Sequence, residues 1–456
     1  MSIDILFVRR RYAQAMRHGL LLILLLCMLG VQTYGQQKSI QTPALDPRSQ
    51  ADIVDSVSAA LTAEYVFPEV AAKMNALLRK NLKLGAYEKL TNPDDFAAKI
   101  TEDLQSISHD KHLNVRYIPP GTQRDEVKLS PEERRRVQLA QQQARNFGFQ
   151  KVEVLPGNIG YIDFRYFAEA KDGGPTAIAA MNFLAYTDAL IFDLRRNGGG
   201  NPSMIQLISS YLFEESVHLN SFYLRKGDST QQFWTQECVE GPKMTGIPVY
   251  VLTSSSTFSG AEEFSYNLKN LKRGTIVGET TGGGAHPVNL REFPVLNISM
   301  AVPYGRAINP ITGTNWEGVG VQPDITASAS KALTVARAEA LKELIRRTSD
   351  ESRKGRLSWT LDELTVEMNP ASPADSMLSS CAGTFGPRSI RFENGTLYYR
   401  RVGRPEFRLI PMGADRFLVE SLDYFRLQFR RDSSGKVNEL VGQYDNGESD
   451  TNPRTQ

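Results

Sequence analysis

The strongest restriction on the fold of this chain is an alternation of strand-like and helix-like segments between residues 152 and 271. Three short apolar runs are typical of buried strands: Gly160–Phe164, Ala189–Leu194 and Ile247–Leu252. After each run come a loop and a segment with apolar residues at helical spacing: Thr176–Ala185, Met204–Phe213 and Ala261–Leu271. This alternation predicts βαβ units around a largely parallel sheet, with the chemistry at the carboxyl ends of the strands.

The segments on either side of this α/β region have a different character. Before it, helical patterns cover residues 51–63, 68–82 and 93–107, and a charged, solvated helix is expected at 130–143, where Ser130 supplies an N-cap. After it, residues 330–346 predict another helix. From Cys381 onward, short strands separated by Gly-Pro, Asn-Gly and Ser-Gly turns predict a small all-β domain.

The first residues are typical of a secretory signal peptide. Four arginines between positions 9 and 17 precede an apolar run from Leu20 to Val31, and Gly35 offers a small residue for cleavage. The run is shorter than the ~20 residues that span a bilayer, although an uncleaved anchor is an alternative. We expect an exported protein, periplasmic or extracellular, that begins near Gln36 and has no stable membrane insertion after cleavage.

Charge and composition exclude several classes of function. With 53 basic and 51 acidic residues, the net charge of +2 gives no reason to expect a nucleic-acid partner. The five histidines are scattered without paired Cys or His spacing, so we expect no metal and no other cofactor. Outside the leader, a bridge between Cys238 and Cys381 is an alternative, but two buried free thiols are expected.

A candidate nucleophile follows the strand at Ile247–Leu252. Ser259 lies at the predicted turn between this strand and the next helix, where its hydroxyl would stand clear of the sheet. The helix dipole and the N–H of Gly260 would favour developing negative charge beside it. The alternative is that this serine-rich segment only caps the helix. Glu262 and Glu263 suit the dipole of the first helical turn, and we expect neither to be catalytic.

A glycine-rich turn follows the strand at Ala189–Leu194. The sequence DLRRNGGG at residues 193–200 frees the backbone to aim N–H groups into a cavity. The rival interpretation is a phosphate-binding loop, but both the P-loop Lys-Ser/Thr and the G-x-G-x-x-G spacing are absent here. An oxyanion hole fits this turn better.

Four motifs in a fixed order resemble those of the tail-specific (C-terminal processing) serine peptidases. Residues 193–200 resemble the family's DLRxNxGG turn, residues 257–264 its nucleophile segment, residues 278–284 its next glycine loop, and residues 318–325 its closing GVxPD element. The resemblance covers about residues 100–325. It implies a crotonase-like spiral of βαβ units with Ser259 as the nucleophile. The oxyanion donors would be the N–H groups of Gly260 and of one glycine at 198–200, with Gly199 expected.

The resemblance also separates two catalytic branches. Members with a Ser–Lys dyad carry their lysine in the glycine loop, where this chain has Gly284. The chain therefore looks like the branch similar to the tricorn core protease, with a Ser-His-Glu arrangement. This similarity implies His112, in the sequence SHDKHL, as the base and Glu317 as the acid that orients it. His109 is an alternative base.

Several further residues enter the predicted site. His286 is a weaker candidate base and could instead bind substrate, and Lys111 is the one lysine beside His112. Gly198, Gly200 and Gly283 are expected to contact substrate. Glu279, which follows a predicted strand, is expected to bond backbone amides.

We therefore expect an exported serine peptidase that forms an acyl-enzyme with peptides or unfolded proteins. The alternative is a catalytically weak or inactive binding protein for hydrophobic ligands, as in interphotoreceptor retinoid-binding protein, which resembles these peptidases. Tyr117 to Val152 leaves too few residues for the PDZ module that many relatives carry. Substrate sequence and oligomeric state are not predicted. The expected units are a signal peptide (1–35), an N-terminal helical domain (36–122), a linker helix (123–150), a crotonase-like peptidase domain (151–346), a linker (347–376) and a small β domain (377–456).

Overall fold

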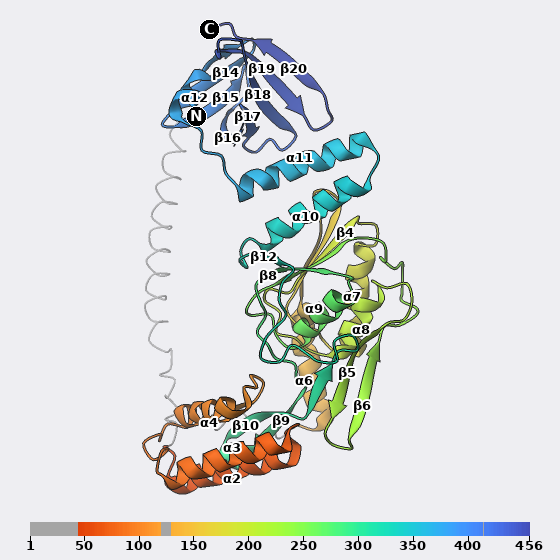
Figure 1. Ribbon diagram of the computed structural model, residues 1–456, viewed down its shortest axis with the longest axis vertical. Coiled ribbons are helices and arrows are strands. Elements are labelled where there is room, and N and C mark those ends of the chain that lie inside the picture. Colours follow the sequence, from red (N-terminus) through yellow and green to blue (C-terminus); the bar gives the residue numbers. More distant parts are fainter. Residues whose placement is uncertain (1–43, 120–128, 414) are drawn as a thin grey trace, which may run out of the picture.

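The computed structural model describes residues 44–119, 129–413 and 415–456. The expected signal peptide and the expected boundary at residues 122 and 123 lie outside these residues. N-terminal helices, a central α/β region and a C-terminal β domain follow one another along the long axis of the molecule (Figure 1). None of the helices in the described ranges combines the length and apolar character that crossing a bilayer requires.

A six-stranded sheet forms the centre of the α/β region. Its strands are β2 (Phe149–Leu155), β3 (Ile159–Phe164), β4 (Ala189–Asp193), β7 (Val249–Thr253), β8 (Thr275–Gly278) and β12 (Ile325–Thr326). Their order across the sheet is β12-β8-β7-β4-β3-β2. All neighbours are parallel except the β2–β3 hairpin. The predicted parallel sheet is therefore confirmed, and β2 adds an antiparallel edge.

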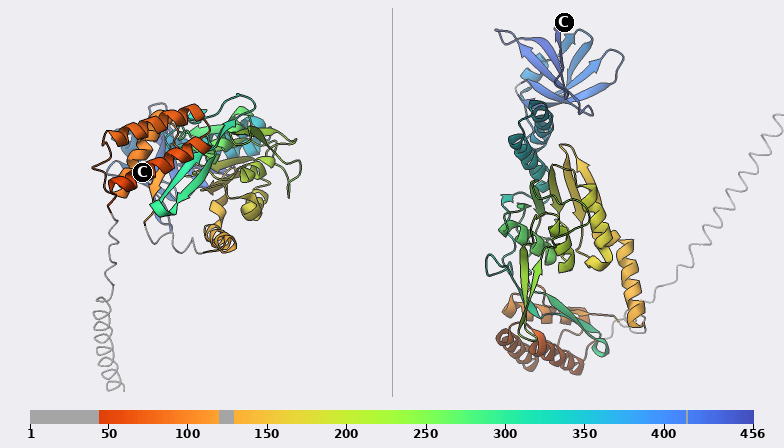
Figure 2. Two further views of the ribbon diagram at one scale, coloured as in Figure 1. Left: turned by 90° about the horizontal axis from the view of Figure 1, so that it is seen from below. Right: turned by 90° about the vertical axis from the view of Figure 1, so that its right-hand side faces the viewer.

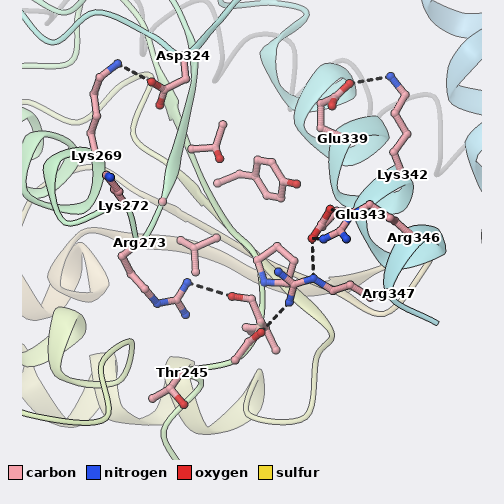
Figure 3. A pocket seen from close by; sticks show the side chains of 17 residues that line it. Thr245, Lys269, Lys272, Arg273, Asp324, Glu339, Lys342, Glu343, Arg346 and Arg347 are labelled. Atoms are coloured by element: carbon pink, nitrogen blue, oxygen red, sulfur yellow. Dashed lines mark hydrogen bonds and ion pairs between the residues drawn. The ribbon is translucent and has the colours of Figure 1, made fainter.

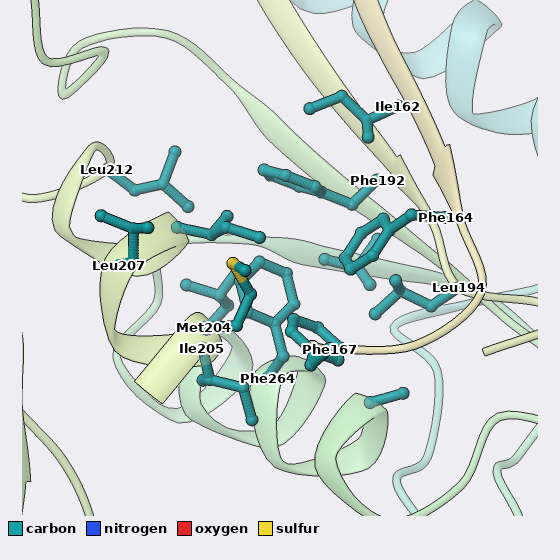
Figure 4. Packing of buried hydrophobic residues seen from close by; sticks show 14 of the residues in the cluster. Ile162, Phe164, Phe167, Phe192, Leu194, Met204, Ile205, Leu207, Leu212 and Phe264 are labelled. Carbon is teal, nitrogen blue, oxygen red and sulfur yellow. The ribbon is translucent and has the colours of Figure 1, made fainter. Parts of the chain in front are cut away.

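Alternate residues of the central strands enter two different cores. On one face, Phe192 and Val251 pack with helices α7 (Ala170–Phe183), α8 (Pro202–Ser210) and α9 (Gly260–Asn270) (Figure 4). On the other face, Ile191 and Tyr250 pack with α10 (Ala332–Arg347) and α11 (Glu351–Met368). Because successive side chains of a strand point to opposite faces, a sheet covered on both sides requires continuous apolar runs.

The N-terminal unit is completed by strands from far along the chain. It contains α2 (Pro47–Glu64), α3 (Pro68–Lys83), α4 (Pro93–Ser108) and β1 (Asn114–Tyr117). Strand β1 pairs with β10 (Ile298–Pro303), which pairs in turn with β9 (Val288–Phe293). Met300 and Val302 of β10 are buried in the same core as α2, α3 and α4. The β9–β10 hairpin thus joins the N-terminal helices to the α/β region.

The remaining elements complete three regions of the molecule. The solvated helix α6 (Pro131–Ala144) starts with the expected Ser130 cap and buries none of its residues. A second small sheet has the order β11-β5-β6, with β5 (His218–Leu224), β6 (Ser229–Trp234) and β11 (Gly305–Ile308). The segment expected as a linker, 347–376, contains the 18-residue helix α11, whose Leu357 and Leu364 are buried.

The C-terminal domain follows α12 (Asp375–Ser380) and is an antiparallel meander, as its turns predict. Its strands are β13 (Gly383–Phe385), β14 (Arg388–Glu393), β15 (Thr396–Arg401), β16 (Glu406–Gly413), β17 (Arg416–Val419), β18 (Phe425–Arg431), β19 (Val437–Tyr444) and β20 (Ser449–Pro453). A bridge between Phe385 and Arg454 joins the first strand to the end of the last, which gives the sheet a barrel-like form. This domain lies at the opposite end of the molecule from the N-terminal helices (Figure 2).

The two cysteines outside the leader are both free thiols. Cys381 is buried, as expected, in the core of the β domain. The expectation that Cys238 is also buried is wrong, because it lies exposed in the loop after β6.

Phe264 tests the core beneath α9. Its ring is fully buried and meets Phe167 and Phe192 at centroid distances of 5.6 and 5.1 Å. We expect Phe264→Ala to lower the free energy of unfolding by about 3–5 kcal/mol, because it leaves a cavity. Phe183→Ala is the matched control, because that ring is 63% exposed. Equal losses in denaturant titrations of the two variants would contradict the packing described here.

Candidate active site

Ser259 lies at the turn between β7 and α9, as the sequence predicts. Its backbone has φ 55° and ψ −122°, a strained conformation for a residue with a side chain. The turn is held on both sides. The Phe258 N–H donates to the carbonyl of Asn197 (3.1 Å), and the Gly282 N–H donates to the carbonyl of Thr257 (2.9 Å). Three separate loops therefore meet at this serine.

Glu262 holds the turn from within α9. Its fully buried carboxylate accepts hydrogen bonds from the N–H of Ser259 (2.8 Å), the N–H groups of Gly283 (2.6 Å) and Gly284 (2.8 Å), and the Thr281 hydroxyl (2.5 Å). Burial raises the pKa of this carboxyl, although the four donors favour its charged form. Glu262 thus fixes the Ser259 turn to the glycine loop.

A cavity of about 430 Å³ opens beside Ser259. It is lined by Gly200, Asn201, Pro202, Phe222, Gln231, Phe233, Ser259, Gly260, Glu263, Gly284, Ala285, His286, Pro287, Val288, Tyr304 and Trp316. Of the expected substrate-contacting residues, Gly200 and His286 line it, whereas Gly198 and Gly283 do not. The Gly283 N–H is instead used by Glu262. The cavity is therefore lined by Ser259 and by residues of both predicted glycine loops.

The backbone around Gly199 changes the expected oxyanion hole. The Gly199 N–H donates to the Asn197 side chain (2.9 Å), so its donor is occupied in this structure. The N–H groups of Gly200 and Gly260 have no acceptor among the described residues, and both glycines line the cavity. Gly199 has a different function. A Cβ there would lie 2.6 Å from the nitrogen of Gly260 and 2.7 Å from the Cβ of Ser259, so only glycine permits this approach.

His112 and Glu317 come together from distant parts of the chain. A ring nitrogen of His112 lies within 4.8 Å of a Glu317 carboxylate oxygen. His112 Nδ1 and Glu317 Oε1 are both buried and have no hydrogen-bond partner among the described residues. Burial lowers the pKa of His112 to about 4, and burial with the nearby charge of Asp110 raises the pKa of Glu317 to about 7. No hydrogen bond joins His112 to Ser259 in the described part of the chain.

The space around Gly284 leaves no room for a lysine at this position of the glycine loop. A Cβ at this position would lie 2.3 Å from the Phe258 ring and 2.7 Å from Cε1 of His112. The His112 and Phe258 rings pack against each other with centroids 4.6 Å apart. The space that a dyad lysine would need is therefore filled by the imidazole and its aromatic neighbour.

A second buried histidine, His286, lies next to His112 and Glu317 and is paired with Asp110. His286 Nδ1 is 2.6 Å from Asp110 Oδ2 and 3.5 Å from Glu317 Oε2. Burial works to lower the pKa of His286, but the hydrogen bond and charge of Asp110 outweigh it and raise the pKa. Asp110 also accepts from the N–H of His112 (3.0 Å). His286 therefore has a fixed carboxylate partner, which His112 lacks.

The same residues offer donor atoms for a metal ion. Asp110, His112 and Glu317 each place one such atom within 4.8 Å of the others, and two carboxylates with imidazole nitrogen suit a divalent transition metal. Asp110 and Glu317 already accept hydrogen bonds from His286 and from the N–H of Ala285. Both carboxylates are therefore engaged with donors of the protein itself.

The remaining polar candidates lie outside the cavity. His109 is exposed and caps the C-terminus of α4 with φ 54°. Lys111 donates to the carbonyl of Gly282 (2.5 Å). Glu279 accepts from the N–H groups of Ser255 (3.2 Å) and Ala329 (2.9 Å), which confirms its expected structural function.

A larger cavity, of about 720 Å³, lies at the opposite ends of the strands, where β7 and β8 begin (Figure 3). Most of its basic side chains already have partners: Lys269 pairs with Asp324 (2.6 Å), and Arg347 pairs with Glu343 (2.6 Å). Arg273 donates to three backbone carbonyls. The chemistry-bearing residues gather instead at the carboxyl ends of the strands, around Ser259.

Comparison with known families agrees with this location. Residues 158–327 match the model of peptidase family S41, and residues 43–156 match the N-terminal domain of Peptidase_S41 in eukaryotic IRBP. The chain belongs to peptidase family S41. The S41 match includes Ser259, Glu317 and all four motifs, whereas His112 lies in the N-terminal match.

Individual relatives of this S41 chain are distant. The tricorn protease of Thermoplasma volcanium is 29% identical over 141 residues, which are 31% of this chain and 12% of that protein. A lipoprotein from Streptococcus agalactiae has 17% identity and a TM-score of 0.43, covering 65% of this chain and 96% of its own. The photosystem II D1 C-terminal processing protease has 16% identity and a TM-score of 0.39, covering 62% and 93%.

The S41 motifs did not indicate the functions proposed for four side chains. Asp110 lies two residues before His112, and no sequence signal separates a partner of His286 from an ordinary loop acid. Glu262 and Glu263 lie in the first turn of a helix, where the helix dipole favours acidic side chains whether they are exposed or buried. Their positions in the sequence therefore did not show that both are buried. Asn197 lies within the glycine turn, and its side chain decides which N–H stays available.

Glu262→Gln tests the clamp on the nucleophile turn. Glutamine keeps the volume but loses the charge and replaces one acceptor oxygen with a donor, so buried N–H groups lose their partner. We expect the free energy of unfolding to fall by about 2–4 kcal/mol. Glu279→Gln also removes a carboxylate that accepts two backbone N–H groups, but it lies near water and should cost much less. If the two variants unfold at the same denaturant concentration, Glu262 is not the clamp.

Proposed function

We propose that this S41 chain is a serine peptidase that cleaves peptides or unfolded proteins through an acyl-enzyme on Ser259. The observation that carries the proposal is the strained Ser259 turn, which opens into a cavity beside the two backbone N–H groups of Gly200 and Gly260 that lack acceptors. An acyl-transfer site needs this combination of an exposed hydroxyl and fixed N–H donors.

In the proposed reaction, His112 takes the Ser259 proton as Oγ attacks the peptide carbonyl carbon. The carbonyl oxygen becomes an oxyanion that accepts from the N–H groups of Gly260 and Gly200; Gly200 replaces the Gly199 donor first expected. The C–N bond then breaks, and the leaving amine takes the proton from His112. Water, deprotonated by His112, hydrolyses the ester and restores Ser259.

Glu317 is the proposed positioning acid of this triad. The two buried atoms that lack partners, His112 Nδ1 and Glu317 Oε1, are the two that a triad would pair. Reorientation of the imidazole would form this hydrogen bond and direct the other ring nitrogen at Ser259, since catalytic contacts are often long in unliganded sites. A paired Glu317 would stabilise the imidazolium that forms during the reaction.

The proposal extends to the fold and the location of the protein. The parallel strands with glycine turns at their carboxyl ends support a crotonase-like spiral of βαβ units for residues 151–346. The basic and apolar leader supports export with cleavage near Gly35 and function in the periplasm or outside the cell.

A carrier of hydrophobic ligands is the second candidate function. The match of residues 43–156 to the N-terminal domain found in eukaryotic IRBP favours it, as do the aromatic walls of the cavity. The carrier would not need the Ser259 hydroxyl, whereas the peptidase does.

Labelling with a fluorophosphonate separates the two functions. We expect the purified protein to form a phosphonyl adduct that peptide mapping assigns to Ser259, because the neighbouring base and N–H donors activate that hydroxyl. Ser259→Ala should lose the label and hydrolysis of a casein-type substrate while keeping its thermal unfolding temperature. An unlabelled protein that binds a fluorescent fatty acid equally well with and without the Ser259 hydroxyl would favour the carrier.

The pH dependence distinguishes the two candidate bases. A general base acts when deprotonated, so kcat/KM falls as the pH drops through its pKa. Burial lowers the pKa of His112 to about 4, so this imidazole stays a neutral base well below pH 6.5, and protonation of Glu317, whose pKa is raised to about 7, sets the acidic limb instead. Asp110 raises the pKa of His286, so a His286 base predicts a loss that begins above pH 6.5. We expect the acidic limb of kcat/KM to persist in His286→Ala, and we expect His112→Ala to lose more activity than His286→Ala.

A further inference from the structure

Glu263 is a buried acid that the proposed mechanism does not use. It lies in the first full turn of α9, four residues after Ser259, so its Cα is about 6 Å along the helix axis from that of the serine. The side chain is 3% exposed and lines the same cavity as Ser259. Burial raises the pKa of its carboxyl to about 8.

The surroundings of Glu263 contain no positive partner for it. The residues that line the cavity include no lysine or arginine, and the one histidine among them, His286, is hydrogen-bonded to Asp110. The Asn220 side chain lies beside Glu263 and is fully buried, but neither of its polar atoms reaches hydrogen-bonding geometry within the described ranges. Buried carboxyls are normally paired, so this one lacks a partner that a ligand could supply.

Part of the wall of the cavity that Glu263 lines is aromatic. Phe222 and Phe233 come from the β5–β6 hairpin and meet edge to face at 5.0 Å, and Trp316, in the loop before Glu317, lines the cavity as well. Such walls suit the methylene stem of a long side chain, and aromatic faces also attract cations.

We propose that Glu263 is the floor of a substrate subsite that binds a lysine or arginine side chain on the residue whose carbonyl is attacked. The proposal rests on the proposed peptidase function. The attacked carbonyl must lie at Ser259, with its oxygen at Gly260 and Gly200, so the side chain on its own Cα is the one nearest the cavity. The four-carbon stem of lysine spans the one helical turn between Ser259 and Glu263.

Binding to a catalytically dead protein tests the subsite without relying on turnover. In Ser259→Ala, calorimetry would compare three tetrapeptides that differ only in the residue before the scissile bond: lysine, norleucine or glutamate. We expect the lysine peptide to bind roughly 30-fold more tightly than the norleucine peptide, because its ammonium group favours the ionised form of the Glu263 carboxyl and pairs with it. Adding Glu263→Gln should remove this preference and leave norleucine binding within about twofold.

Glu240→Gln is the matched control, because it removes the same charge from an exposed position outside the cavity. It should keep the lysine preference, and equal thermal unfolding temperatures of the variants would exclude misfolding. Equal binding of the lysine and norleucine peptides would overturn the subsite, as would a lysine preference that survives Glu263→Gln. Since fluorophosphonate labelling reports Ser259 alone, a labelled protein without lysine preference would refute the subsite and leave the peptidase proposal standing.

Discussion

The buried carboxylate of Glu262 is the interaction on which the rest of the site depends. One side chain accepts from the N–H of Ser259 and from two N–H groups of the glycine loop, so nucleophile and loop share a single anchor. The loop in turn places Gly284 against His112 and Phe258. A strained turn persists only when its surroundings over-determine it, and four hydrogen bonds to one carboxylate provide that determination.

Burial and neighbouring charge give the ionisable groups around Ser259 different pKa values and different hydrogen-bond partners. His112 and His286 lie in one buried group, yet the pKa of the first is lowered by burial and that of the second is raised by Asp110. Glu262 accepts four hydrogen bonds, whereas Glu263, the next residue along the same helix, faces a cavity whose lining residues include no lysine or arginine. Adjacent carboxylates therefore separate into a structural clamp and a candidate binding group.

The order of residue types along the sequence predicted those features of the fold that depend on residues close together in the chain. The strand–turn–helix at Ser259, the parallel sheet and the β domain follow from periodicity and turn residues, and these are confirmed. Pairing between distant segments could not be predicted in this way, because no periodicity indicates that β10 completes the N-terminal core. Gly199 and Gly200 were also indistinguishable, because the choice between their N–H groups depends on the Asn197 side chain. Glu263 could not be separated from Glu262 because one dipole rule describes both.

The β9–β10 hairpin has a consequence for how the protein is made. His112 immediately precedes β1, which is held in place by β10, and Glu317 follows later still. Under the proposed triad, a nascent chain that has emerged beyond Ser259 still lacks both the strand that docks its base and the acid that orients it. The order of synthesis would therefore act as a safeguard, keeping the peptidase latent until nearly the whole catalytic region has left the ribosome.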